Sequence, residues 1–127
     1  MLGFGSNFAD LEFVSSGTLR DWMRNQDSYT SFTGGEVQRM LISCLDALEH
    51  FHRVICLAHF DVKSTKILLT EAKARRLCDF SYSRNPDSVT ILQGTFEYMR
   101  AELFQGKVSN FSVVYSLAIT FIQFICR

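Results

Sequence analysis

The sequence predicts a mainly α-helical fold with one small β-hairpin. A helical period runs through residues 36–53, and an apolar run covers residues 113–126. Between them lie two short apolar runs, residues 67–70 and 76–78, separated by residues that can form a turn. We therefore expect a long helix before and another after a short antiparallel pair of strands.

The composition fits one globular domain. The chain has 127 residues, 47% of them apolar, and its 13 basic and 13 acidic side chains cancel. A neutral chain has no strong field that would attract nucleic acid or an anionic membrane surface. The high fraction of apolar residues and the low fraction of charged residues also argue against intrinsic disorder. The four cysteines are too scattered for a paired metal or redox motif, and we expect reduced thiols in the core.

Neither end of the chain carries a membrane signal. Residues 1–10 lack the basic start and the apolar run of a signal peptide, so a cytoplasmic location is expected. The apolar run near the C-terminus is shorter than the roughly 18 residues of a membrane span. It is also interrupted by Ser116, Thr120 and Gln123, which predicts a buried helix and no transmembrane span.

Two helices are expected in the first half of the chain. A short one covers residues 18–24. The longer one begins after Thr33, because Thr33 and Glu36 have the spacing of a capping box. It ends near His52 and Arg53, whose charge suits the negative end of the helix dipole. The apolar residues of this helix share one face: Val37, Met40, Leu41, Cys44, Leu45, Leu48 and Phe51.

A polar stretch, residues 81–94, separates the hairpin from the last helix. It has no sustained period and holds Pro86, the one proline of the sequence. A loop of this length within a compact domain is usually functional or disordered.

The segment formed by residues 57–80 carries the candidate chemistry. It places Asp61 and Lys63 in a loop before the hairpin and Asp79 directly after it. Phosphoryl transfer uses a carboxylate that accepts the proton of the attacking hydroxyl and a lysine that neutralises the phosphate. It also uses a second carboxylate that holds Mg²⁺. A hairpin between the two loops can bring Asp61 and Asp79 to one cleft.

These residues resemble motifs of the protein kinase family. The family's catalytic loop, His-Arg-Asp-x-Lys-x-x-Asn, is matched by His-Phe-Asp-Val-Lys-Ser-Thr-Lys at residues 59–66. Its Asp-Phe-Gly motif is matched by Asp-Phe-Ser at residues 79–81. The end of its activation segment is similar to Gly-Thr-Phe-Glu-Tyr-Met-Arg-Ala-Glu at residues 94–102.

Two further blocks extend the resemblance over nearly the whole chain. Residues 12–19 are similar to the hinge and the helix that follows it, and residues 112–116 to the opening of the large lobe's central helix. Lys63 and Thr95 are similar to serine/threonine kinases, and residues 63–69 to the tyrosine-kinase-like or receptor-like group. Five blocks in the family's order make a specific signal.

The resemblance implies roles for the catalytic loop and the loop after the hairpin. Asp61 would be the catalytic base, and Lys63 would contact the γ-phosphate of ATP. Asp79 would hold Mg²⁺. The acceptor in the family is a protein, so protein substrates or protein partners are expected and nucleic acid is not.

The resemblance also implies a nucleotide site and phosphorylation sites. Backbone groups of Glu12 and Val14 would bind adenine, with Leu68 beneath the ring. The candidate phosphosites of the activation segment are Tyr82, Ser88 and Thr90.

Several positions depart from the family pattern. Lys66 replaces the asparagine whose carbonyl oxygen binds the second Mg²⁺, and an ammonium group has three donors and no acceptor. Lys66 therefore cannot ligate a metal and is expected to pair with Asp61 or Asp79. The other departures are Phe60 for arginine, Ser81 for glycine, Val113 for aspartate, and Arg100-Ala101 for Ala-Pro.

The blocks divide the chain into parts of a kinase domain. We expect a strand and hinge remnant at 1–14, two helices at 15–56, the catalytic loop and hairpin at 57–80, the activation segment at 81–102 and the start of the central helix at 103–127. Residues 3–8 are interpreted as the strand that leads to the hinge. This division predicts a partial, degenerate C-terminal lobe with the small lobe absent.

Three functions stay open at this point. The first is a serine/threonine protein kinase domain that is inactive or impaired in this form. The second is a pseudokinase-like protein-binding module, which associates through the apolar helix at 113–126 because uncovered apolar surface of that size favours a partner. The third is a degenerate fragment without independent function.

Overall fold

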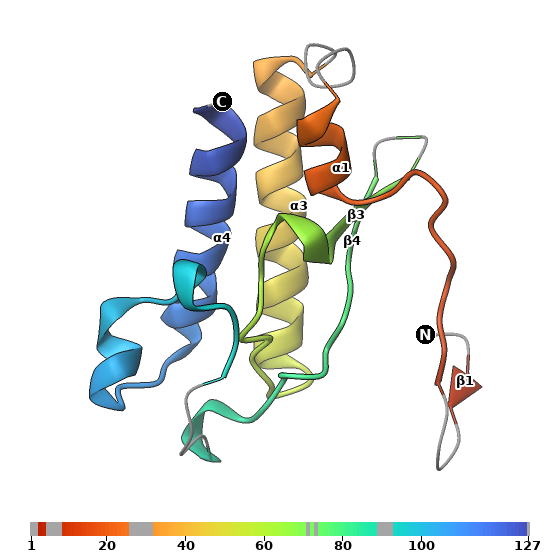
Figure 1. Cartoon of the computed structure of the whole chain (residues 1–127). Helices are drawn as coiled ribbons and strands as arrows, with labels where there is room; N and C mark the ends of the chain where they lie inside the picture. The colour runs from red at the N-terminus through yellow and green to blue at the C-terminus, as the bar shows by residue number, and fades with distance from the viewer. Residues whose placement is uncertain are drawn as a thin grey trace.

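The computed structural model is mainly helical, and two antiparallel pairs of strands accompany the helices (Figure 1). It describes residues 3–4, 9–25, 32–70, 72, 74–88 and 93–126. The helices are α1 (Leu19–Arg24), α3 (Gly34–Arg53) and α4 (Asn110–Ile125). The strands are β1 (Gly3–Phe4), β2 (Ala9–Asp10), β3 (Ile67–Leu69) and β4 (Arg75–Leu77). Short 3₁₀ turns include η1 (Ser64–Lys66), η2 (Pro86–Ser88), η3 (Phe96–Tyr98) and η4 (Ala101–Gln105).

The predicted long helix and its capping box are both present. The Thr33 hydroxyl accepts the Glu36 N–H at 3.3 Å, and the Glu36 carboxylate accepts the Thr33 N–H at 2.8 Å. The capping box satisfies two backbone donors that the first helical turn leaves open. The buried residues of α3 are Met40, Cys44 and Leu48, which lie on the predicted apolar face.

The short helix α1 has a capping box of the same kind. The Thr18 hydroxyl accepts the Asp21 N–H at 3.2 Å, and the Asp21 carboxylate accepts the Thr18 N–H at 2.8 Å. Leu19 is fully buried and Trp22 donates its ring N–H to the Ser16 carbonyl at 2.7 Å. A six-residue helix has little stability of its own, so these contacts hold it to the rest of the molecule.

The predicted hairpin forms, with its second strand displaced by one residue. Ile67 pairs with Leu77 and Leu69 with Arg75. Cys78, which was expected in the strand, donates its N–H to the Lys66 carbonyl at 3.0 Å beyond the paired region. Two residues of the predicted turn, 71 and 73, lie outside the described residues.

The N-terminal region differs from the prediction of one strand that leads to the hinge. Two short strands, β1 and β2, pair antiparallel, with Gly3 opposite Asp10 and Phe4 opposite Ala9. The backbone therefore reverses direction before the proposed hinge. Residues 5–8 lie outside the described residues.

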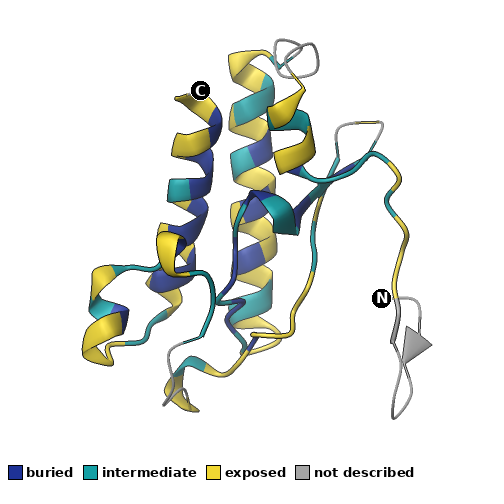
Figure 2. Ribbon diagram, in the orientation of Figure 1, coloured by how far each residue is buried: buried dark blue, intermediate teal, exposed yellow. Residues whose placement is uncertain are grey.

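Helix α4 lies beside α3 and runs antiparallel to it (Figure 1). One face of α4 is buried and the other is exposed (Figure 2), so the expectation of a buried helix holds for one face only. The large exposed side chains of α4 are Phe111, Val114, Tyr115, Ile122 and Ile125. Among the described residues, no helix is both long enough and apolar enough to cross a membrane.

Polar residues within α4 connect it to the segment before it. The Ser116 hydroxyl donates to the Tyr98 carbonyl at 2.6 Å, and the Tyr98 hydroxyl donates to the Gln123 side-chain oxygen at 2.8 Å. Thr120 donates to the Ser116 carbonyl at 2.8 Å. Two of the residues that interrupt the apolar run, Ser116 and Gln123, therefore fix the position of η3.

The central core joins the helices to the loop and hairpin between them. Its buried residues are Leu19, Met40, Cys44, Leu48, Ala58, Val62, Ile67, Leu69, Val113, Leu117, Phe121 and Phe124. Ala58 and Val62 belong to the predicted catalytic loop, and both are fully buried. The loop is therefore held by the same packing that holds the helices.

The prediction of four core thiols is correct only for Cys44. All four cysteines are free, but Cys56 and Cys126 are exposed and Cys78 is partly buried. Cys56 lies just after the end of α3 and Cys126 just after α4, where the chain leaves the core. Burial raises the pKa of the Cys44 thiol to about 11, so it stays protonated at neutral pH.

Truncation of a core residue on α4 should destabilise the protein far more than truncation on its outer face. Leu117 is fully buried, and we expect Leu117→Ala to cost about 2–5 kcal/mol of unfolding free energy. The matched control is Ile122→Ala on the exposed face, with an expected cost of about 0.5–1 kcal/mol. Urea unfolding followed by circular dichroism measures both. Equal losses would contradict the assignment of the two faces.

Candidate active site

The loop that follows α3 is fixed to the polar stretch by a short backbone bridge. Ala58 donates its N–H to the Arg84 carbonyl at 2.8 Å, and Arg84 donates back to the Ala58 carbonyl at 3.1 Å. The predicted long loop is therefore ordered at its start. The segment between residues 88 and 93 lies outside the described residues.

His59 connects the two predicted functional loops from inside the core. Its ring is fully buried, its Nδ1 accepts the Asp61 N–H at 3.3 Å, and its Nε2 lies 3.1 Å from the Cys78 carbonyl. These two partners assign the proton to Nε2, which then donates to the carbonyl. Burial lowers the pKa of His59, which favours this neutral form. His59 thus ties the backbone at Asp61 to the residue before Asp79.

Asp61 and Lys63 lie together, and Thr95 joins them. The Thr95 hydroxyl donates to Asp61 Oδ1 at 2.6 Å, and Lys63 Nζ lies 3.2 Å from Asp61 Oδ2. The same ammonium donates to the Thr95 hydroxyl oxygen at 2.5 Å. Asp61 is only 4% exposed, so these two partners compensate the desolvation of its carboxylate. The structure therefore brings both predicted catalytic residues together.

Gly94 makes the approach of Thr95 to Asp61 possible. Its φ is +115°, and a Cβ at this position would lie 2.2 Å from the Phe60 carbonyl oxygen. No residue with a side chain fits there without a shift of the backbone. From the sequence alone, Thr95 indicates only the serine/threonine type of kinase. Its contact with Asp61 had no local signal, because 34 residues separate the two.

The backbone is strained on both sides of the site. Phe60 has a φ of +57° and Asp79 a φ of +62°, in the left-handed region that residues with a Cβ rarely occupy. Such conformations cost about 1–3 kcal/mol each and are found most often at functional sites. Here they turn the chain directly before Asp61 and at Asp79 itself.

Lys66 pairs with Asp79, which decides between the two partners expected from the sequence. The Lys66 ammonium donates to Asp79 Oδ2, and the Ser81 hydroxyl donates to Asp79 Oδ1 at 2.6 Å. The bond from Lys66 is the main cause, and the bond from Ser81 the second, of the lowered pKa of Asp79. The same bond raises the pKa of Lys66. Asp79 is therefore held as a carboxylate beside a fixed ammonium group.

The residues of this site, as they lie, do not fit a magnesium ion. Both oxygens of Asp79 are engaged by side chains, and the ammonium of Lys66 offers no lone pair to a metal. Within the described part of the chain, no three His, Cys, Asp or Glu side chains are grouped so as to hold a metal ion. An ion could reach Asp79 only if Lys66 moved away from it, so the binding of Mg²⁺ at Asp79 stays a prediction.

Three other departures from the family pattern, Phe60, Val113 and Arg100, have contacts within this structure. Phe60 packs partly buried against the core, and Val113 is 1% exposed within it. Arg100 forms an ion pair with Glu102 at 2.8 Å. The structure of this chain therefore accommodates these substituted side chains, and their effect on catalysis is a separate question.

The residues predicted to bind adenine lie on adjoining segments. Thr18 forms a backbone bridge with Leu68, and Leu69 donates its N–H to the Gly17 carbonyl at 3.0 Å. Glu12 pairs with Arg76 at 3.4 Å, where both side chains are about half exposed. These contacts hold the segment that contains Glu12 and Val14 against the β3–β4 hairpin. Their role in nucleotide binding stays a prediction.

Of the three candidate phosphosites, two are described. Tyr82 and Ser88 are both exposed, and the Ser88 hydroxyl donates to the Asn85 carbonyl at 2.9 Å. Thr90 lies outside the described residues. Modification at any of them stays a prediction.

Comparison with known proteins agrees with the motifs and their geometry. A family model described as the protein kinase domain matches residues 8–127. This chain belongs to the protein kinase family. The resemblance noted from the sequence is thereby confirmed.

Relatives of this kinase-family chain include receptor kinases and serine/threonine kinases. Wall-associated receptor kinase 4 of Arabidopsis thaliana is 32% identical over 120 residues, 88% of this chain and 16% of that protein. A Dictyostelium discoideum protein, named as a probable LIM domain-containing serine/threonine-protein kinase, is 33% identical over 121 residues, 91% of this chain and 18% of that protein. The chain thus spans less than a fifth of the length of these two relatives.

A solved kinase structure shares the fold. The Cydia pomonella granulovirus kinase PK-1 matches with a TM-score of 0.79 at 20% sequence identity, over 90% of this chain and 41% of that chain. The described helices and hairpin therefore form part of a protein kinase fold.

A side chain at position 94 should disrupt the site, whereas one at position 106 should not. Gly106 also has a positive φ, +74°, but a Cβ there meets nothing within 4 Å. We expect Gly94→Ala to cost at least about 3 kcal/mol and Gly106→Ala about 1 kcal/mol. Urea unfolding measures both variants. A Gly94→Ala protein as stable as Gly106→Ala would contradict the close approach to Phe60.

Stability should fall on acidification because His59 is buried. The pKa of His59 in the folded protein lies below the usual value of about 6.5, so the unfolded chain binds the proton first as pH falls. The stabilisation from neutral His59 is thus complete above about pH 6.5 and is lost as pH falls through the lowered pKa. The difference in unfolding free energy between the parent and His59→Gln should therefore narrow as pH falls below about 6.5. A difference between the parent and His59→Gln that stays constant as pH falls would contradict the burial of a neutral His59.

Proposed function

We propose that this chain is part of the large lobe of a serine/threonine-type protein kinase domain whose phosphoryl transfer is impaired by the ion pair between Lys66 and Asp79. The main support for the proposal is this ion pair, in which the Lys66 ammonium binds the carboxylate that the family uses for Mg²⁺. We infer the type of activity from the family motifs, and we infer its impairment from the lysine at position 66.

The arrangement around Asp61 supports the family's type of chemistry. Asp61 Oδ1 accepts a hydroxyl donor, that of Thr95, at 2.6 Å, which is the contact that the hydroxyl of a protein substrate would make with a catalytic base. Lys63, at 3.2 Å from the other oxygen, supplies positive charge where a transferred phosphate would lie. In this proposal Glu12, Val14 and Leu68 bind the adenine of ATP.

The arrangement around Asp79 supports the impairment. Phosphoryl transfer depends almost entirely on positioning and on electrostatic stabilisation of the phosphates. A bound Mg²⁺ would supply two positive charges at this place, whereas Lys66 supplies one positive charge and hydrogen-bond donors only. To bind the ion, Asp79 would first have to lose its bond to the Lys66 ammonium.

A second candidate function is a protein-binding module without catalysis. The exposed apolar face of α4 favours it, since Phe111 is 72% exposed and Ile125 is 60% exposed. A contiguous apolar surface on a soluble domain often marks an interaction site. Light scattering distinguishes the two, because a monodisperse monomer that still binds nucleotide favours the catalytic domain.

Replacement of Lys66 by asparagine should raise Mg²⁺-dependent phosphoryl transfer. The asparagine restores an oxygen ligand and frees Asp79, so we expect Lys66→Asn to transfer labelled phosphate from ATP to a generic acceptor protein at least about tenfold faster than the parent. A thermal shift by ATP with Mg²⁺ should also increase. The matched control is Lys107→Asn, an exposed lysine, which should behave as the parent.

Two results would speak against the proposal. Transfer by the parent that is as fast as by Lys66→Asn would show that the ion pair does not impair the site. Transfer by Lys66→Asn that survives the additional change Asp61→Ala would show that Asp61 is not the base. If neither form binds ATP, the protein-binding module becomes the better interpretation.

A further inference from the structure

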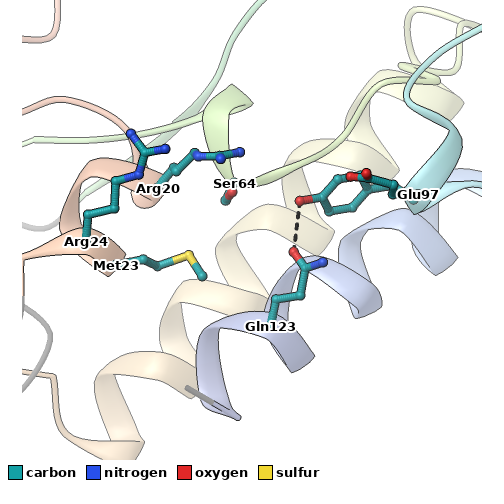
Figure 3. A pocket seen from close by; sticks show the side chains of 7 residues that line it. Arg20, Met23, Arg24, Ser64, Glu97 and Gln123 are labelled. Atoms are coloured by element: carbon teal, nitrogen blue, oxygen red, sulfur yellow. Dashed lines mark hydrogen bonds between the residues drawn. The ribbon is translucent and has the colours of Figure 1, made fainter.

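A pocket of about 350 Å³ lies beside the candidate active site (Figure 3). It is formed where α1, η1, η3 and α4 meet. Its lining residues are Arg20, Met23, Arg24, Ser64, Glu97, Tyr98 and Gln123. Ser64 directly follows Lys63 in the chain, so a group bound in this pocket would lie close to the catalytic loop.

Two arginines give one side of the pocket a positive charge. Arg20 and Arg24 are four residues apart on α1, both are exposed, and neither forms a hydrogen bond or an ion pair with a described residue. The carboxylate of Asp21 lies between them in sequence, but it is engaged by the backbone N–H of Thr18 at 2.8 Å and by its hydroxyl at 2.6 Å. Like charges at this spacing repel each other on a helix, so a bound anion would stabilise them.

Ser64 adds an unused hydroxyl at the same place. Its residue is only 3% exposed, it lines the pocket, and its side chain hydrogen-bonds to no described residue. Because Ser64 lines the pocket and makes no such bond, its hydroxyl can donate to or accept from a ligand that enters there. In the view of Figure 3, Ser64 lies between Arg20 and Gln123.

The remaining lining residues limit where an anion can bind. Glu97 is the one acidic residue of the lining, and it lies on the far side from the two arginines (Figure 3). The Tyr98 hydroxyl is already used, since it donates to Gln123 at 2.8 Å. An oxyanion would therefore be bound at the end formed by Arg20, Arg24 and Ser64.

We propose that this pocket binds an acidic side chain of a polypeptide. The bound group is an oxyanion, either the carboxylate of Asp or Glu or the phosphate of a phosphorylated residue. The guanidinium groups of Arg20 and Arg24 and the Ser64 hydroxyl would donate hydrogen bonds to it. A polypeptide is the ligand because the pocket adjoins a loop that, under the proposed function, receives a protein hydroxyl. The acidic residue then lies a few positions from that hydroxyl and selects the substrate.

The test measures peptide binding to the full chain without nucleotide. Labelled peptides carry a central serine and, a few residues away, glutamate, phosphoserine or glutamine, with each position on both sides of the serine sampled. Fluorescence anisotropy should give at least about tenfold tighter binding for an acidic peptide than for its glutamine counterpart. Inorganic phosphate should compete, and added salt should weaken the binding.

Variants connect the binding to the pocket. The double change Arg20→Ala and Arg24→Ala should remove the preference for the acidic peptide, and Ser64→Ala should weaken binding about threefold. Arg39→Ala, at an exposed arginine of α3 outside the pocket, should leave it unchanged. If the double alanine variant does not fold, Arg20→Gln with Arg24→Gln keeps the length of the side chains and removes the charge.

The outcomes separate this proposal from the proposed function. Equal affinity for the glutamate and glutamine peptides, or an unchanged preference in the double variant, would overturn it. Tighter binding of the phosphoserine peptide than of the glutamate peptide supports it with phosphate as the source, and the reverse supports it with a carboxylate. Because no ATP is present, the result does not depend on whether the chain transfers phosphate.

Discussion

A buried carboxylate needs partners, and Asp61 obtains one of its two, the Thr95 hydroxyl, from a segment 34 residues away. At 4% exposure its negative charge would be costly without Lys63 and the hydroxyl of Thr95. This requirement brings the segment that contains Thr95 onto the catalytic loop. It also explains Gly94, because only glycine allows the backbone to approach the Phe60 carbonyl closely enough. On the other side of Thr95, Tyr98 fixes the same segment to α4 through Ser116 and Gln123.

The pair formed by Lys66 and Asp79 has a different character. Both side chains keep some contact with solvent, 19% for Lys66 and 40% for Asp79, so the pair is not a requirement of the core. Its effect is chemical, because it engages the carboxylate that the family pattern assigns to a metal. Ser81, which replaces a glycine of that pattern, donates to the other oxygen of Asp79. The two departures therefore act on one carboxylate, and together they support the proposal of an impaired site.

The pocket joins the short helix α1 to this arrangement. Helix α1 is held by its capping box, by buried Leu19 and by the bond from Trp22 to Ser16, and none of these contacts uses the side chains of Arg20 and Arg24, which line the pocket. Ser64, which lines the same pocket, belongs to the loop that carries Asp61. Binding of an acidic peptide and presentation of its hydroxyl would then use neighbouring parts of one loop. The proposed substrate preference and the proposed chemistry thus depend on the same packing of the loop against the core.

The sequence by itself determined the features that depend on near neighbours. The capping box of Thr33 and Glu36, the apolar face of α3 and the existence of the hairpin follow from spacings of a few residues, and the ordered motifs determined the family. Only the tertiary structure decided which carboxylate Lys66 pairs with, that Thr95 contacts Asp61, and that α1, η1, η3 and α4 enclose a pocket. These contacts join residues far apart in the chain, and their geometry is set by the packing of the whole core, for which local spacing carries no signal. The same reason explains why the second strand is displaced by one residue and why Cys56 and Cys126 lie outside the core.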